Sequence, residues 1–252
     1  MLHDAVTSTT RWALFLDVDG TLLELAETPE QVYVPERLKS LLSEVAEHMD
    51  DAVALISGRT IENLDELFTP LKLRASGVHG AERRDASGRI VRAQIDTSKL
   101  QSVRDELAGF VAAHEGLLLE DKSFALALHY RLAPQMQAKA LAAVTSIVDR
   151  LGHEYVLQTG KCVYEIRPSA WTKGTAVRAF LSETPFAGRV PIYIGDDVTD
   201  EHAFDVVNEL GGMSVRVGDA AATLARFRLP RVADVHEWLH SLPLPAPLAR
   251  AS

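Results

Sequence analysis

The chain has 252 residues, and its composition, 47% hydrophobic and 24% charged, is typical of a soluble globular protein with a sizeable core. Its formal net charge of −9 disfavours a nucleic-acid partner, and none of its apolar runs is long enough to span a membrane. The single cysteine, Cys162, excludes an intramolecular disulfide, and residues 1–10 lack the features of a secretory signal, so we expect a cytoplasmic protein.

The first part of the chain alternates apolar runs with amphipathic stretches. Buried strands are expected at 12–16, 52–56 and 73–77. Helices are expected at 34–49 and 61–68, because leucine, isoleucine and valine recur there with helical spacing. Strands and helices that alternate with such short connections predict a parallel sheet with helices on its faces.

From about residue 82 the pattern becomes that of an antiparallel α+β unit. A turn at 85–88 separates two candidate strands, and Pro168 closes the unit. Between them we expect two helices and four strands: helix 99–114, strands 117–120 and 124–131, helix 134–151, and a hairpin of 155–159 and 161–166.

The parallel pattern then resumes. The expected elements are a helix at 172–182, a strand at 191–194, a helix through 203–210, a strand at 213–217, and a last helix opened by a capping box at 234–237. The predicted fold class is α/β, with a doubly wound, Rossmann-like core around a parallel sheet. Residues 1–81 and 169–252 form this core, and residues 82–168 form an inserted α+β domain.

Polar clusters follow three of the predicted core strands. Asp17-Val18-Asp19-Gly20-Thr21 follows the first strand, Ser57 follows the second, and Asp196-Asp197 follows the strand at 191–194. Ligands of an open parallel sheet bind outside the carboxyl ends of its strands, so these clusters are expected to converge in one crevice. Lys173, at the start of a helix, can reach the same place.

The chemistry of these residues fits the transfer of a phosphoryl group. Asp17 can attack phosphorus, and Asp19 can protonate the leaving alcohol and later deprotonate water. Asp17, Asp19 and Asp196 offer the hard oxygen ligands that Mg²⁺ prefers. Lys173 supplies a positive charge and Ser57 a hydroxyl donor for the phosphate.

Each motif also has a purely structural interpretation. Asp-Gly and Ser-Gly pairs after a strand are typical of turns. Asp200 and Glu201 suit a helix N-terminus, although Asp200 could also order metal-bound waters. The functional interpretation is preferred because every cluster follows a strand end, and it leaves open whether Asp196 or Asp197 binds the metal.

These motifs resemble those of the haloacid dehalogenase-like phosphohydrolases: a DxDGT loop, a Ser after a strand, a Lys, and Gly195-Asp196-Asp197-Val198-Thr199-Asp200. The resemblance implies a Mg²⁺-dependent phosphatase with an aspartyl-phosphate intermediate and an inserted cap domain. It also implies that residues of the first two loops bind the substrate: Gly20, Thr21, Gly58 and Arg59.

More narrowly, the chain resembles the trehalose-6-phosphate phosphatases, through Ser57-Gly58-Arg59, the stretch 79–82, and charged residues of the inserted domain. The resemblance implies that four of these charged residues bind sugar hydroxyls: Glu120, Lys122, Lys161 and Glu165. Lys161 and Glu165 would share a strand face by alternation.

Three further residues of the resemblance need a separate interpretation. His129 and Arg131 share a strand face and are either further substrate ligands or an ion pair, and we count Arg131 among the substrate-binding candidates. His79 is expected to be structural, at the junction of the two domains.

The implied function is the hydrolysis of trehalose 6-phosphate in trehalose biosynthesis, by a monomer whose partner is the sugar phosphate. The alternatives are another capped phosphatase, acting on sucrose phosphate or a mannosyl phosphoester, a phosphomutase, and a non-catalytic phosphosugar-binding regulator. The sequence leaves open whether a synthase binds the protein.

Overall fold

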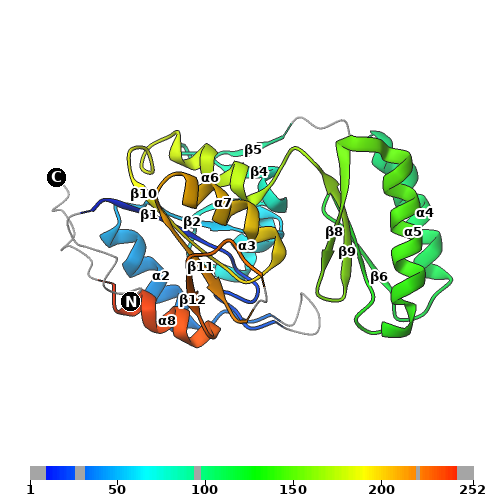
Figure 1. Ribbon diagram of the computed structural model, residues 1–252, viewed down its shortest axis with the longest axis horizontal. Helices are drawn as coiled ribbons and strands as arrows, with labels where there is room; N and C mark the ends of the chain where they lie inside the picture. Colours follow the sequence, from blue (N-terminus) through cyan, green and yellow to red (C-terminus); the bar gives the residue numbers. More distant parts are fainter. Residues whose placement is uncertain (1–9, 26–31, 94–97, 220–221, 243–252) are drawn as a thin grey trace. The chain divides into compact units, whose positions relative to one another are not determined.

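The structure is a computed structural model that describes residues 10–25, 32–93, 98–219 and 222–242. Residues 1–9, on which the expectation about a secretory signal rests, lie outside these ranges. The chain divides into two compact units, one of Met1–Val91 with Thr172–Ser252 and one of Arg92–Trp171 (Figure 1). None of the helices in the described ranges combines the length and the apolar composition needed to cross a bilayer.

The first unit is built on an eight-stranded sheet in the order β12-β11-β10-β1-β2-β3-β4-β5. The strands from β12 to β3 are parallel, and β4 is antiparallel to β3. Their bounds are β1 Trp12–Leu16, β2 Val53–Ile56, β3 Arg74–Gly77, β4 Glu82–Arg84, β5 Ile90–Arg92, β10 Val190–Gly195, β11 Met213–Val217 and β12 Phe227–Leu229. The central strand β1 lies between β10 and β2, and this arrangement places the ends of three parallel strands side by side.

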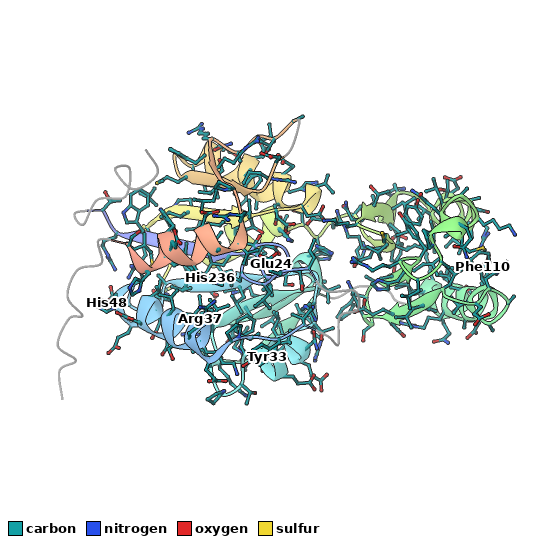
Figure 2. All side chains as sticks on the ribbon, turned by 90° about the horizontal axis from the view of Figure 1, so that it is seen from below. Glu24, Tyr33, Arg37, His48, Phe110 and His236 are labelled. Atoms are coloured by element: carbon teal, nitrogen blue, oxygen red, sulfur yellow. The ribbon has the colours of Figure 1, made fainter. Side chains whose placement is uncertain are left out.

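Helices cover both faces of this sheet because the buried strands are apolar on both sides. Leu14 and Leu16 of β1 pack with α2 (Glu36–His48), α3 (Ile61–Phe68) and α8 (Val232–His240). Ala13 and Phe15, which point to the opposite face, pack with α6 (Lys173–Leu181) and α7 (Glu201–Glu209). Figure 2 labels Arg37 and His48 on α2 and His236 on α8. His236 connects α8 to the loop after β1, since its Nε2 lies 2.8 Å from the carbonyl oxygen of Leu22.

The second unit is a four-stranded antiparallel sheet with two helices on one face (Figure 1). Its strands, in the order β6-β7-β9-β8, are β6 Leu118–Asp121, β7 Leu126–His129, β9 Val163–Pro168 and β8 Tyr155–Gly160. The helices are α4 Ser98–Ala112 and α5 Gln137–Leu151. Alternate residues of β7 and β9 turn toward them and form a core of their own: Leu126, Leu128, Tyr164 and Ile166.

The expected fold class, a doubly wound α/β core with an inserted α+β unit, is confirmed. The hairpin of β4 and β5 belongs to the large sheet, however, whereas the sequence assigns residue 82 onward to the insertion. Glu82 and Arg83 pair with Gly77 and Ser76 of β3, so the chain leaves the sheet about ten residues later than expected.

Two details near the end of the described chain also differ from expectation. The predicted capping box at 234–237 is wrong, because α8 begins at Val232 and Asp234 lies inside it. The Asp234 carboxylate instead accepts hydrogen bonds from the Arg231 guanidinium at 3.0 and 3.2 Å. The edge strand β12 was not predicted, since three residues are too few to show an alternating pattern.

Candidate functional site

Three carboxylates meet at the carboxyl ends of the central strands. Asp17 follows β1 and Asp196 follows β10, and these strands are parallel neighbours. The Asp17 N–H extends their ladder by donating to the carbonyl oxygen of Ile194 at 2.9 Å. Asp200, in the short helix η5 (Val198–Asp200), completes the group, and one carboxylate oxygen of each residue lies within 4.8 Å of the others.

Lys173 lies among these acids and is 3% exposed. Its Nζ donates to Asp17 Oδ1 at 2.6 Å and to Asp200 Oδ1 at 2.7 Å. The lysine occupies the first turn of α6, which begins after the N-cap Thr172. Tyr193 of β10 donates its hydroxyl to the same Asp200 oxygen at 2.7 Å, so the buried Asp200 carboxylate is held from two sides.

The crowding of these charges changes their proton affinities. Burial and the negative charge of Asp200 raise the pKa of Asp17 well above its ordinary value, although Lys173 opposes the shift. The same two causes raise the pKa of Asp196 to about 6. Burial acts to lower the pKa of Lys173, but Asp17 and Asp200 outweigh it and raise that pKa. Lys173 therefore stays a cation, and the carboxylates around it carry more negative charge than it neutralises.

Two glycines allow the backbone to pass close to the acids. Gly20 has a φ of +82°, and a Cβ there would lie 2.1 Å from Asp196 Oδ2. A Cβ on Gly195 would lie 2.3 Å from the carboxyl carbon of Asp200. The DxDGT and GDxxxD loops thus need their glycines so that they can fold against these carboxylates. The Thr21 hydroxyl lies between the Asp17 and Asp196 carboxylates, 3.3 Å from Asp17 Oδ2 and 3.5 Å from Asp196 Oδ1.

A second group forms between the loops after β1 and β2. Arg59 binds both carboxylate oxygens of Asp19, through Nε and Nη2, at 2.7 Å each. Its remaining terminal nitrogen donates to Asn63 Oδ1 at 2.7 Å. Ser57 is 1% exposed, and its hydroxyl oxygen accepts the Arg59 N–H at 3.1 Å. Gly58 lies between them, so the predicted Ser57-Gly58-Arg59 motif connects directly to Asp19.

The acidic group suits a divalent cation. Carboxylate oxygens are the ligands that Mg²⁺ prefers. Burial first, and the charge of Asp200 second, raise the pKa values of Asp17 and Asp196, and a bound cation would favour their ionised forms. The group contains Asp17 and Asp196 from the predicted ligand set, and Asp200 in addition. The group does not include the Asp19 carboxylate, which accepts two hydrogen bonds from Arg59, and the predicted part of Asp19 in metal binding stays a prediction.

In the inserted unit, two of the predicted sugar ligands, Glu120 and Glu165, lie on the sheet face opposite the helices. Glu120 and Glu165 both align with Ala127 in the strand register, so they share one row. Lys122 Nζ lies 3.3 Å from Glu165 Oε2, and both side chains are about nine-tenths buried. Glu120 Oε2 lies 2.8 Å from His129 Nε2.

The proton affinity of Glu120 reflects this setting. Burial acts to raise the pKa of Glu120, but the hydrogen bond from His129 and the charge of Lys122 outweigh it, so the net shift is downward. Glu120 is therefore held as a carboxylate, the form that accepts hydrogen bonds from hydroxyls.

The expectation that Lys161 and Glu165 share a strand face by alternation is wrong. Strand β9 begins at Val163, so Lys161 lies in the turn before it. Cys162 has a φ of 64°, and this left-handed residue breaks the alternation. The carbonyl oxygen of Lys161 accepts a hydrogen bond from Arg131 Nη2 at 3.1 Å, which ties Arg131 to the turn.

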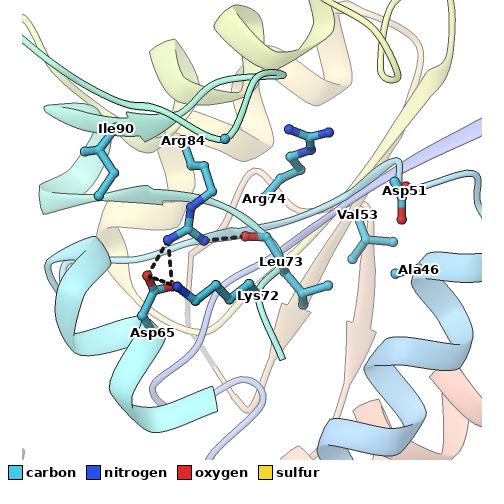
Figure 3. Close-up of a pocket in the computed structure, with 10 residues that line it drawn as sticks. Ala46, Asp51, Val53, Asp65, Lys72, Leu73, Arg74, Arg84 and Ile90 are labelled. Atoms are coloured by element: carbon cyan, nitrogen blue, oxygen red, sulfur yellow. Dashed lines mark hydrogen bonds and ion pairs between the residues drawn. The ribbon is translucent and has the colours of Figure 1, made fainter. Parts of the chain in front are cut away.

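A cavity of about 440 Å³ lies elsewhere in the first unit, at the amino ends of β2 and β3 (Figure 3). The Arg84 guanidinium donates to both Asp65 carboxylate oxygens at 2.6 Å and to the carbonyl oxygen of Leu73 at 2.8 Å. Arg74 donates to the carbonyl oxygen of Asp85 at 2.7 Å. These interactions hold α3, β3 and β4 together. The group of Asp17, Asp196 and Asp200 lies instead at the carboxyl ends of the strands.

Two contributors to the site were not predicted from the sequence. Tyr193 lies inside an apolar strand, so its sequence context predicts only a residue of the hydrophobic core. A buried tyrosine hydroxyl needs a hydrogen-bond partner, however, and this requirement could have indicated a polar neighbour. Asn63 lies in the first turn of α3, and only its position four residues after Arg59 hints at the contact between them.

The sequence is similar to known phosphatases along most of its length. A family model described as trehalose-phosphatase matches residues 15–232. A probable trehalose-phosphate phosphatase from Sinorhizobium fredii is 47% identical over 212 residues, which are 84% of this chain and 80% of that protein. The trehalose-6-phosphate phosphatase of Escherichia coli is 44% identical over 232 residues, 92% of this chain and 86% of that protein.

A solved structure agrees with the architecture. The C-terminal domain of C. albicans trehalose-6-phosphate phosphatase is 24% identical, with a TM-score of 0.81 and coverage of 91% of both chains. At that identity the likeness shows the fold alone. The family model covers well over half of the chain, and both relatives are far more than 30% identical. The chain therefore belongs to the trehalose-phosphatase family.

Proposed function

We propose that the protein hydrolyses trehalose 6-phosphate to trehalose and phosphate. The observation that carries this proposal is the buried Lys173 between Asp17 and Asp200, at the strand ends of a chain in the trehalose-phosphatase family. A buried cation beside a carboxylate can hold a phosphate group against a nucleophile in a site of low dielectric constant. The relatives from S. fredii and E. coli are named for the same activity.

The reaction consists of two displacements at phosphorus. An Asp17 oxygen attacks phosphorus, the bond from phosphorus to the sugar oxygen breaks, and that oxygen takes a proton from Asp19. Water then attacks the aspartyl phosphate, gives a proton to Asp19, and breaks the bond from phosphorus to Asp17. Both Asp19 oxygens accept bonds from Arg59 in the described structure, so one bond gives way when Asp19 is protonated.

The remaining residues of the first unit hold the phosphate. Lys173 and the Ser57 hydroxyl are its proposed ligands, together with N–H groups near Gly20, Thr21 and Gly58. Asp17 and Asp196, with Asp200 beside them, would hold Mg²⁺, which when bound neutralises the negative charge that opposes attack by a carboxylate.

The second unit, Arg92–Trp171, contains the proposed specificity determinants. Glu120, Lys122 and Glu165 form a charged row on the second sheet, and charged groups make strong, directional hydrogen bonds to hydroxyls. Arg131 and Lys161, joined through the turn before β9, are the other proposed ligands of the disaccharide.

A phosphate-release screen tests the function. Trehalose 6-phosphate, sucrose phosphate, a mannosyl phosphoester and p-nitrophenyl phosphate are compared with and without Mg²⁺. The matched inactive variant is Asp17→Asn, which keeps the shape of the side chain and removes the nucleophile. We expect metal-dependent release that is fastest with trehalose 6-phosphate and absent from the variant.

Each alternative gives a different result in the same screen. Faster release from sucrose phosphate or the mannosyl ester would reassign the substrate. A product that keeps its phosphoryl group would indicate a phosphomutase. Binding without metal-dependent turnover would indicate a regulator, and normal turnover by Asp17→Asn would exclude the aspartyl-phosphate mechanism.

A further inference from the structure

The turn between β3 and β4 has an unusual backbone. Val78 and His79, in the short helix η2 (Val78–Gly80), have φ angles of 46° and 54°, in the left-handed region that residues with side chains rarely adopt. Val78 is 2% exposed and His79 is 7% exposed. Two buried left-handed residues in succession, one of them β-branched, persist only where the surrounding structure imposes them.

This turn holds the loop after β2 through main-chain hydrogen bonds. The Val78 N–H donates to the carbonyl oxygen of Arg59 at 2.9 Å, and the His79 N–H donates to that of Ser57 at 3.0 Å. The left-handed conformation aims both N–H groups at the loop, one at each end of Ser57-Gly58-Arg59. The strained turn thereby determines where this loop lies.

The His79 side chain adds a second contact in the middle of the loop. A Cβ built on Gly58 would lie 2.8 Å from both Cε1 and Nε2 of His79, and the three nearest atoms all belong to that ring. The φ of Gly58 is one that any residue adopts, so the conformation of the loop does not itself require glycine there. The imidazole ring occupies the space where a side chain at position 58 would lie.

The held loop leads directly to the proposed proton-transfer group. The backbone of Arg59 is fixed at its carbonyl oxygen by Val78, and its guanidinium binds Asp19 through both carboxylate oxygens. The same turn also packs against α6, where a Cβ on Gly80 would lie 2.8 Å from the carbonyl oxygen of Thr172. A displacement of the loop would therefore move Arg59 and, with it, Asp19.

We infer that His79 is a positioning residue, which holds the Ser57-Gly58-Arg59 loop so that Arg59 can orient Asp19 for proton transfer. The inference rests on the proposed phosphatase function. It predicts that disturbing the contact between His79 and Gly58 impairs the step that needs a proton more than the binding of phosphate.

The test is a double-mutant cycle of Gly58→Ala and His79→Gly. Gly58→Ala places a methyl group on the imidazole ring, and His79→Gly removes the ring while keeping the left-handed backbone and its N–H. Gly109→Ala, where nothing lies within 4 Å of the added Cβ, is the matched control and is expected to leave all rates unchanged. Folding of each variant is checked by circular dichroism and thermal unfolding.

The rate of leaving-group release is measured before the steady state with two substrates. Release of trehalose needs a proton from Asp19, whereas p-nitrophenolate leaves without one. We expect Gly58→Ala to slow trehalose release by about tenfold or more, a partial loss of the roughly 10²–10⁴-fold that general acid catalysis contributes. In the His79→Gly background the same substitution should change the rate by about twofold or less, the usual limit of additivity. Release of p-nitrophenolate should change little in His79→Gly. In Gly58→Ala, where the altered residue lies near the proposed phosphate ligands, it should fall clearly less than the release of trehalose.

Two results would overturn the inference. An equal effect of Gly58→Ala in both backgrounds would show that the ring is not the cause, and equal losses on both substrates would place the effect on phosphate binding. If Gly58→Ala does not fold, His79→Gly alone still tests the inference, which predicts slower trehalose release and unaltered p-nitrophenolate release. A wild type that hydrolyses p-nitrophenyl phosphate but not trehalose 6-phosphate would refute the proposed function alone, and the cycle would then be measured with glycerol phosphate.

Discussion

Lys173 is surrounded by acids that it cannot neutralise alone. It forms ion pairs with Asp17 and Asp200 at 2.6 and 2.7 Å, and Asp196 lies in the same group. Moving a charged group from water into the protein interior costs on the order of several kcal/mol per ion unless partners compensate. A site of this kind is held together by its charge balance, so changes in pH, metal and hydrogen bonding should each have a measurable effect.

The affinity for Mg²⁺ should fall as the pH falls below about 6, because the pKa of Asp196 in the metal-free protein is about 6 and only the carboxylate binds a metal. Below that pH the cation must displace a proton, which weakens binding by about tenfold per pH unit for one proton. The raised pKa of Asp17 acts in the same direction. Isothermal titration with Mg²⁺ at two pH values below 6 and two above it measures the effect, and an affinity independent of pH would contradict it.

Tyr193→Phe should destabilise the protein although it removes a single oxygen atom. The hydroxyl donates to Asp200 Oδ1, and both residues are fully buried, so no water can replace the lost donor. Loss of a bond to a buried charge predicts a decrease of about 1–3 kcal/mol in the free energy of unfolding. Chemical denaturation measures the change, with Tyr33→Phe as control, since Tyr33 is 72% exposed. Equal stability of the two variants would show that the hydrogen bond is dispensable.

The sequence predicts which residues gather at the strand ends better than it predicts their partners. Asp17 and Asp196 follow apolar runs that are recognisable as strands, so parallel topology alone brings them together. The bidentate bond from Arg59 to Asp19 joins loops 40 residues apart, and its geometry depends on the path of the backbone between them. Pairing between side chains of two loops depends on the conformation of both loops, so it cannot be predicted from the spacing of residues in the sequence.

Among the elements, α6 has the most direct connection to the site, because its first residue is Lys173. Thr172 accepts the Thr175 N–H at 3.1 Å, and Thr175 in turn accepts the Thr172 N–H at 3.0 Å. Thr172→Ala should lower the free energy of unfolding by about 0.5–2 kcal/mol, and Thr172→Ser should restore most of it. The measurement is urea unfolding of both variants, and a serine variant as unstable as the alanine variant would contradict the role of the hydroxyl.

The helices and strands that were predicted correctly are those with a long, regular pattern of apolar residues, such as α2, α5 and β10. The failures are short or irregular segments. In α8, the acid at Asp234 suggests a cap, but the helix already begins at Val232, which is buried like Val235 one turn later. At the β8–β9 turn, the left-handed Cys162 shifts the register, which a strict alternation cannot show.

At the scale of the molecule, the two units have separate cores. The apolar clusters on the two faces of the large sheet contain only residues of the first unit, and the cluster under α4 and α5 contains only residues of the second. Packing defects in one unit therefore need not disturb the other. The division also separates two tasks in the proposed function, phosphate chemistry in the first unit and sugar recognition in the second.

Glu165→Gln should reduce kcat/KM for trehalose 6-phosphate while leaving that for p-nitrophenyl phosphate nearly unchanged. The substitution keeps the shape of the side chain but removes the charge that faces Lys122 at 3.3 Å, in a row assigned to the sugar. A buried lysine without its partner costs about 3–5 kcal/mol, so the unfolding temperature is measured in parallel. The double variant Glu165→Gln with Lys122→Met removes both charges and relieves that cost.

Asp149→Asn is the matched control, because this carboxylate lies on α5 of the same unit and is exposed. The double variant should regain stability but not activity on trehalose 6-phosphate, since recognition of hydroxyls needs the charges and folding does not. Recovery of that activity together with stability would mean that the pair only supports the second unit. Equal losses on both substrates would place Glu165 in the phosphate chemistry, against the division of tasks between the two units.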